Sequence, residues 1–198
     1  MSEPAATTRS GSRRMLLIIA FACVAPFVAS FALYFLWTPA GGQVNYGTLL
    51  TAQPLPLGIL RDQASPSTAT PGTTLRGKWL LLIVDDPACD RRCQAKLYAT
   101  RQSRTMTGKE RDRVERLWLL TAEGSPPPQL LAEHPDLVIA HRDSAAMTTL
   151  LAALPADAPD AIFIVDPLDN LILRYPAEPD IRGLFKDLSR LLFASRIG

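Results

Sequence analysis

An uncharged, strongly apolar run at residues 15–37 limits what this chain can fold into more than any other feature. As an α-helix the run would rise roughly 35 Å, at about 1.5 Å per residue, which is enough to cross a hydrocarbon core about 30 Å thick. Tyr34 and Trp37 suit the far membrane boundary, where aromatic side chains are enriched. We therefore predict a transmembrane helix over residues 15–37.

Basic residues indicate the orientation of this helix. Arg9, Arg13 and Arg14 lie just before the run, whereas no Lys or Arg follows it until Arg61. Because positively charged flanks stay in the cytoplasm, we expect residues 1–14 to form a cytoplasmic tail and the rest of the chain to lie outside. A cleaved signal peptide is the alternative, since residues 20–22 read AFA, but the apolar run continues well beyond a usual signal core.

The remaining chain divides into a tether and a folded domain. Residues 38–74 are rich in Pro, Gly, Ser and Thr without a sustained apolar period, which predicts a flexible tether. Residues 75–198 alternate short apolar runs with helical patterns, which predicts an α/β sandwich. The predicted strands lie at 79–84, 117–121, 137–140, 161–165 and 171–175, and the predicted helices at 91–106, 144–154 and 179–195.

Two cysteines, Cys89 and Cys93, follow the first predicted strand in KWLLLIVDDPACDRRCQAKLY. A disulfide between them would close a very short loop, so it would restrain the unfolded chain little and add little stability. The cysteines open a predicted helix, where free N–H groups and the helix dipole favour a thiolate, and Arg91 and Arg92 add positive charge. The pair therefore predicts a redox nucleophile or a soft metal ligand.

The stretch RGKWLLLIVDDPACDRRC resembles the strand and C-x-x-x-C turn of the Sco family, and DAIFIVDPLDNLILRY is similar to that family's late strand, turn and strand. The resemblance covers residues 75–195. It implies a membrane-tethered, thioredoxin-like domain that helps to assemble the copper centre of cytochrome c oxidase. It also implies that Pro159 is a cis-proline facing the cysteines. The family's copper-ligand histidine would fall near Ala158, where this chain has none.

The two histidines and the basic residues carry weaker signals. His134 and His141 have no motif spacing to the cysteines, which favours solvated or helix-end roles, although His141 ends a predicted strand and is a third-ligand candidate. Basic residues dominate 91–116, where a solvated helix face is the favoured interpretation and docking on an acidic partner or anionic lipid is the alternative. No nucleic-acid motif accompanies them, so nucleic acid is not expected as a partner.

These features lead to one hypothesis and one alternative. The hypothesis is a single-pass protein of the bacterial inner membrane whose periplasmic, thioredoxin-like domain acts in cytochrome c oxidase assembly, with an oxidase subunit or another assembly factor as partner. Cys89, the more exposed thiol at the helix start, would attack and Cys93 would resolve the mixed disulfide, or both would hold Cu(I). Oxidoreductase and copper chaperone both stay open. The alternative is a non-catalytic interaction module that holds a membrane-protein assembly intermediate.

Overall fold

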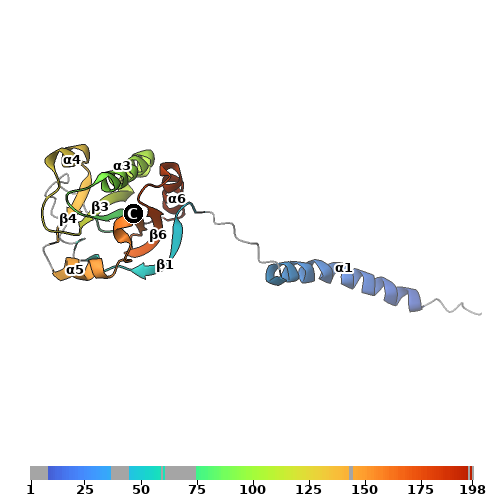
Figure 1. Ribbon diagram of the computed structural model, residues 1–198. Helices are drawn as coiled ribbons and strands as arrows, with labels where there is room; N and C mark the ends of the chain where they lie inside the picture. The colour runs from blue at the N-terminus through green and yellow to red at the C-terminus, as the bar shows by residue number, and fades with distance from the viewer. Residues whose placement is uncertain are drawn as a thin grey trace, which may run out of the picture. The chain divides into compact units, whose positions relative to one another are not determined.

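The computed structural model describes residues 9–36, 45–58, 60, 75–142, 145–195 and 197 (Figure 1). The chain divides into two units, one ending at Val44 and one beginning at Asn45. The first unit contains helix α1 (Arg9–Leu36), whose stretch Arg13–Leu36 is long and apolar enough to cross a membrane, with a mean hydropathy of 2.6. This agrees with the predicted single-pass anchor, although α1 begins before residue 15 and Trp37 lies outside the described residues.

The second unit is built on a six-stranded mixed sheet with the strand order β1-β6-β5-β2-β3-β4. β2, β3 and β4 pair in parallel, whereas β5 pairs antiparallel with β2 and β6, and β6 pairs antiparallel with β1. All five predicted strands are present. The strands are β1 (Thr48–Pro54), β2 (Trp79–Asp85), β3 (Val114–Leu120), β4 (Leu137–Ala140), β5 (Ala161–Val165) and β6 (Asn170–Pro176).

Helices cover both faces of this sheet (Figure 1). Along β2 the side chains alternate: Leu80 and Leu82 join the core under α5, whereas Leu81 and Ile83 face the other way, toward α6 and α3. The predicted α/β sandwich is therefore confirmed. The helices are α3 (Arg91–Met106), α4 (Pro128–Glu133), α5 (Ala145–Ala152) and α6 (Ile181–Ala194), with 3-10 helices η1 (Gly108–Arg113) and η2 (Ala158–Asp160).

The predicted tether is wrong for part of its length. β1 lies inside residues 38–74 and forms an edge of the sheet, paired with β6, and Leu55 and Leu57 after it are buried in the core. The domain therefore begins near Asn45 instead of Leu75. The local composition conceals this strand because its pairing partner is distant in sequence. Residues 37–44, 59 and 61–74 lie outside the described residues.

A buried carboxylate fixes the chain just before β1. Asp187 on α6 accepts hydrogen bonds from the backbone N–H groups of Tyr46 (2.7 Å) and Gly47 (2.9 Å) and from the hydroxyl of Tyr175 (2.8 Å). Close packing here requires glycine: a Cβ at Gly47 would lie 2.5 Å from the Tyr175 ring, and one at Gly183 would lie 2.7 Å from the Tyr46 ring. The segment that enters the domain is thus held against α6.

Candidate functional site

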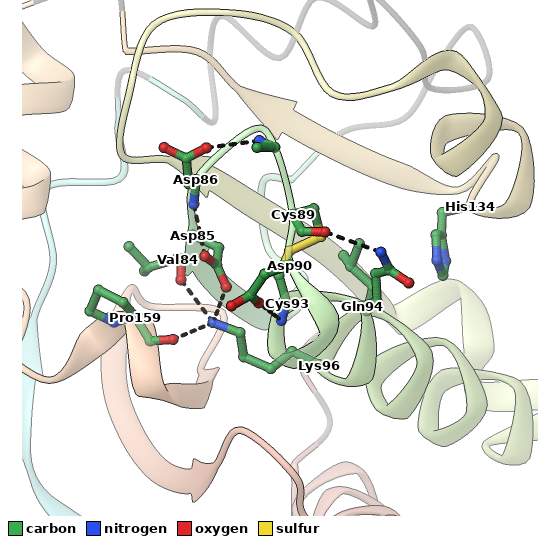
Figure 2. The surroundings of a disulfide bond; sticks show 12 residues. Val84, Asp85, Asp86, Cys89, Asp90, Cys93, Gln94, Lys96, His134 and Pro159 are labelled. Atoms are coloured by element: carbon green, nitrogen blue, oxygen red, sulfur yellow. Dashed lines mark hydrogen bonds and ion pairs between the residues drawn. A yellow bond between two sulfur atoms is a disulfide. The ribbon is translucent and has the colours of Figure 1, made fainter.

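The two cysteines lie where the chain turns from the end of β2 into α3 (Figure 2). Asp86 forms the turn: its carboxylate accepts from the N–H of Ala88 (2.8 Å) and its carbonyl oxygen accepts from the N–H of Cys89 (3.0 Å). Asp90 caps α3 by accepting from the N–H of Cys93 at 2.9 Å. Cys89 has a φ of +46°, in the left-handed region that a residue with its side chain seldom adopts. Such strain is concentrated at functional sites.

Cys89 and Cys93 form a disulfide, with their Cα atoms 5.0 Å apart. Their exposed fractions are only 2% and 0%, and they pack in an apolar cluster with Ile83 and Leu97. Gln94 lies against the turn, because its Nε2 donates to the carbonyl oxygen of Cys89 at 3.1 Å. The expected exposure of Cys89 at the helix start is therefore wrong for this oxidised form. Attack on either sulfur requires the turn to move.

The charges around the cysteines are also more balanced than the sequence suggested. Arg92 forms an ion pair with Asp160 at 2.6 Å, and both side chains are more than half exposed. Arg91 is exposed to solvent. The carboxylate of Asp90 lies at the helix N-terminus, where it takes up the N–H of Cys93. The arginines therefore supply less positive charge to the sulfurs than expected, since Arg92 is paired with Asp160 and the Asp90 cap places a carboxylate at the same helix end.

A buried ion pair lies on the inner side of α3, and no motif predicted it (Figure 2). The side chain of Lys96 is 0% exposed, and its ammonium lies 2.7 Å from a carboxylate oxygen of Asp85. It also donates to the carbonyl oxygens of Val84 (3.0 Å) and Pro159. All three ammonium protons thus have acceptors, as a buried charge requires. The available sequence signal is a lysine one helical turn after Cys93, following an aspartate that ends a buried strand.

The peptide bond before Pro159 is trans, since the described residues contain no cis peptide bond. Pro159 lies in η2, a short turn in which the N–H of Asp160 donates to the carbonyl oxygen of Asp157 at 2.9 Å. This turn leads the chain into β5 without a cis bond, so the expected cis-proline is wrong. Pro159 instead contributes its carbonyl oxygen to Lys96.

Neither histidine joins the cysteines in a metal site. His134 is buried, its Nδ1 lies 3.3 Å from a guanidinium nitrogen of Arg116, and burial together with Arg116 lowers the pKa of His134 to about 4. His141 follows β4 and is half-buried. Within the part of the chain that the structure describes, no three His, Cys, Asp or Glu side chains cluster as metal ligands. Two thiolates alone suit Cu(I) and do not suit Cu(II), which favours nitrogen and oxygen ligands.

A second polar cluster lies toward the other end of α3. Arg116 on β3 is fully buried and donates to the carboxylate of Asp136 (3.0 Å) and the carbonyl oxygen of Leu97 (2.9 Å). Arg104 of α3 binds the same carboxylate at 2.8 Å and that of Glu115 at 3.3 Å. Burial lowers the pKa of Arg116 to about 10, and burial raises the pKa of Glu115. The cluster joins α3 to β3 and to the segment before β4.

Part of the basic run at 91–116 is therefore not a solvated face. Lys96, Arg104 and Arg116 are buried and paired with carboxylates. The favoured interpretation of this run as exposed charge is wrong for these three residues, because the fold brings carboxylates from β2, β3 and the turn before β4 under α3.

Comparison with known proteins supports the fold of the second unit. The family model described as "Transmembrane-like, thioredoxin-like, C-terminal domain" matches residues 79–195. That range contains the cysteine pair and both buried charge clusters. No curated protein matches the sequence significantly.

Solved Sco structures have the same fold. The solution structure of apo Sco1 from Thermus thermophilus shares 18% identity with a TM-score of 0.54 and covers 76% of this chain and 99% of that chain. The crystal structure of yeast Sco1 with copper bound shares 12% identity with a TM-score of 0.53 and covers 78% of this chain and 96% of that chain. At these identities the similarity establishes the fold alone. The predicted thioredoxin-like fold and the resemblance to Sco proteins are thereby confirmed at that level.

Proposed function

Because this chain belongs to the family of transmembrane-like, thioredoxin-like C-terminal domains, we propose that it is a membrane-anchored thiol-handling protein of cytochrome c oxidase assembly. α1 is the anchor in the bacterial inner membrane. The arginines before its apolar stretch keep the N-terminus in the cytoplasm, and the domain from Asn45 onward lies in the periplasm. Its partner is an oxidase subunit or another assembly factor.

One observation carries this proposal: the Cys89–Cys93 disulfide lies at a strand-to-helix turn that holds Cys89 in a left-handed conformation. A ring this short restrains the unfolded chain little, so stability is a weak reason for the pair. Strain at Cys89 is a cost that a purely structural bridge does not need. The geometry therefore favours a disulfide that is made and broken.

In the proposed exchange reaction Cys89 attacks first and Cys93 resolves the mixed disulfide. In the reduced protein the Cys89 thiolate attacks a client disulfide, forms a mixed disulfide and expels one client thiolate. The Cys93 thiolate then attacks Sγ of Cys89, which re-forms the internal disulfide and expels the second client thiolate. The client gains two electrons and this protein loses two; the reverse sequence oxidises the client.

Copper(I) is the second cargo that the same pair fits. After reduction the two thiolates are soft ligands of the kind that Cu(I) accepts. Neither His134 nor His141 supplies the nitrogen ligand that Cu(II) favours, so the proposal is Cu(I) binding without a stable Cu(II) complex. Titration of the reduced protein with each ion checks this, and a tight Cu(II) complex that is lost on His141→Ala would contradict it.

The exchange proposal is tested by trapping the mixed disulfide. The Cys93→Ser variant, incubated with oxidised glutathione, should accumulate an adduct through Cys89, whereas Cys89→Ser should accumulate much less. Free thiols and adducts are counted by mass spectrometry, with Cys23→Ser in α1 as the control that keeps wild-type exchange. A native Cys89–Cys93 bond that resists dithiothreitol until the domain unfolds would show that the disulfide is structural.

Burial of both sulfurs is the one observation that favours the alternative, a non-catalytic interaction module. The double variant Cys89→Ala, Cys93→Ala distinguishes the two in cells that lack the chain. Under the exchange proposal the variant fails to restore cytochrome c oxidase activity. Full restoration at wild-type protein levels would favour the interaction module.

A further inference from the structure

The solvent-facing side of α6 combines cations with an exposed aromatic ring. At about 100° per residue, Arg182, Lys186, Arg190 and Phe193 fall on one stripe, opposite the core-facing Leu188. We call these four residues the α6 stripe. Phe193 is 94% exposed, more than any other large apolar side chain described in the folded domain. Within α6 itself the one acidic residue, Asp187, is buried, and the exposed carboxylate of the N-cap Asp180 accepts from the N–H of Arg182.

A groove of about 690 Å³ adjoins the α6 stripe, between α6 and the segment formed by the end of α3 and η1. Met106, Phe185 and Leu192 contribute apolar surface to it, and Phe193 belongs to both the groove and the stripe. Lys109, an exposed residue of η1, adds a cation on the opposite side, where the carboxylate of Glu110 is paired with Arg113 at 2.8 Å. Apolar surface and positive charge therefore occur together on this face.

The chain arriving from α1 enters the domain at the same helix. Residues 37–44 are all that separates the end of α1 at Leu36 from the second unit. Tyr46 is held by α6: its ring lies 5.2 Å from the ammonium of Lys186, and its hydroxyl accepts from that ammonium at 3.0 Å. Lys186 and Arg190 stay exposed despite their contacts with Tyr46 and Asp187. In the sequence the apolar anchor is thus followed closely by Tyr46, which contacts Lys186 of the α6 stripe.

We propose that the α6 stripe and its groove dock on a membrane surface that contains anionic phospholipids. Each Lys or Arg near such a surface gains attraction that falls off within a Debye length, and an exposed Phe ring can insert at the boundary between headgroups and acyl chains. A phospholipid complements both features, with phosphate for the cations and acyl chain for Phe193 and the groove. An acidic protein surface would match only the charges. The proposal does not depend on the chemistry of the cysteines.

The experiment uses the full chain in nanodiscs, without reductant. Cys23→Ala removes the free thiol, the disulfide protects Cys89 and Cys93, and Ala194→Cys carries the environment-sensitive fluorophore NBD beside Phe193. With phosphatidylglycerol in the disc the emission should rise and shift to shorter wavelength, and high salt should reverse this. With phosphatidylcholine alone the emission should stay that of an exposed probe. Each cation contributes about fivefold to the docking equilibrium.

Variants identify the surface. Arg182→Glu should lower the docking equilibrium at least about fivefold, because it removes one attraction and adds a repulsion. Phe193→Ser should also weaken it, whereas Arg91→Glu, an exposed cation on α3 outside this face, should leave it unchanged. Equal emission in both kinds of disc, or an equal loss for Arg91→Glu, would overturn the proposal. So would a response to soluble polyglutamate without one to phosphatidylglycerol, which would assign the stripe to an acidic protein.

Discussion

The two ends of α3 bury charge in different ways. Toward the N-terminal end a single ammonium, that of Lys96, meets one carboxylate, that of Asp85, and two carbonyl oxygens. Toward the C-terminal end two guanidinium groups, those of Arg104 and Arg116, share the carboxylate of Asp136. The ion pair of the first end lies beside the turn that carries the disulfide, whereas the carboxylate shared at the second end lies in the segment before β4.

We infer that the N-terminal end of α3, beside the disulfide, can change conformation more easily than the C-terminal end. We call the cluster of Arg104, Arg116 and Asp136 the fixed end. Arginine offers a planar fork of five donors that bridges several partners, whereas lysine is a point charge on a flexible stem. Arg104 and Arg116 therefore cross-link α3 to β3 and to the segment before β4. The cysteine turn has local hydrogen bonds from Asp86, Asp90 and Gln94 and the disulfide itself, but only one buried ion pair beside it. The predictions below test this contrast.

Removing a guanidinium from the fixed end should have the largest effect. Arg116→Met removes one of the two buried guanidinium groups that bind Asp136 and leaves the carbonyl oxygen of Leu97 without its donor, so we expect the free energy of unfolding to fall by about 4–5 kcal/mol. Urea unfolding of the oxidised protein measures this. The control is Arg111→Met, whose half-exposed guanidinium lies 3.8 Å from Asp136 and should cost about 1 kcal/mol or less. Similar losses in both would remove the contrast.

The ion pair near the cysteines should cost less to break. Lys96→Met leaves Asp85 without its partner, but the Asp85 side chain is 17% exposed and recovers some solvation, so the expected loss is about 3–4 kcal/mol. The same unfolding assay measures it, with exposed Lys109→Met as the control that changes little. We also expect the disulfide of the variant to be reduced faster by dithiothreitol. An unchanged reduction rate would separate Lys96 from the cysteine turn.

Acid should lower the free energy of unfolding through His134, which contacts Arg116 of the fixed end. The pKa of His134 is about 4 in the folded protein and 6.5 ordinarily, so between these values the unfolded chain binds more protons. Stability should therefore fall by about 2–3 kcal/mol as the pH drops from about 6.5 to about 4. Glu115 opposes this, because its raised pKa lets the folded state take up a proton as the pH falls.

Two histidine variants test whether His134 causes this pH dependence, since Asp136 responds to acid in a different range. For Asp136, burial alone would raise the pKa, but Arg116 and Arg104 bring it below its ordinary value, so its carboxylate adds a loss of stability only in stronger acid. His134→Gln should flatten the decline, whereas His141→Gln, at the end of β4, should retain it. An equal flattening by both variants would contradict the assignment to His134.

Removing the disulfide should have the smallest effect on stability. The ring that the Cys89–Cys93 bond closes is very short. The double variant Cys89→Ala, Cys93→Ala should therefore lose only about 2 kcal/mol or less of the free energy of unfolding. Cys23→Ala is the matched control in α1. A loss larger than that of Arg116→Met would reverse the contrast and make the cysteine turn the more fixed end of α3.

Elements whose own residues carry their signal could be predicted from the sequence. α3 was expected at 91–106 and β4 at 137–140, and both occupy those residues. The N-cap and the strand before α3 are local features, so the position of the cysteine pair could be predicted as well. β1 could not, because its partner β6 follows it only after most of the domain.

The surroundings of the cysteines depend on contacts that the sequence does not display. A lysine is normally exposed, so the sequence predicts that Lys96 belongs to a basic surface. In the folded domain Asp85, Val84 and Pro159 surround its ammonium instead. The burial of both sulfurs arises likewise from packing against β2 and α3. Residue types predicted which side chains carry chemistry, whereas tertiary packing determines their exposure.

The hydrogen bonds from Tyr46 and Gly47 to Asp187 have a consequence for the order in which the domain folds. The N–H of Tyr46 reaches a carboxylate 141 positions later, and β1 pairs with β6. A chain made from its N-terminal end must therefore keep β1 unpaired until β6 has been synthesised, and Tyr46 unbound until α6 follows. Contacts this distant in sequence form slowly. After β6 has joined β5 and before β1 pairs with it, β6 presents an open edge to which other strands can add. The segment that follows α1 is therefore the first part of the domain to be made, yet its partner in the sheet is the last strand of the chain.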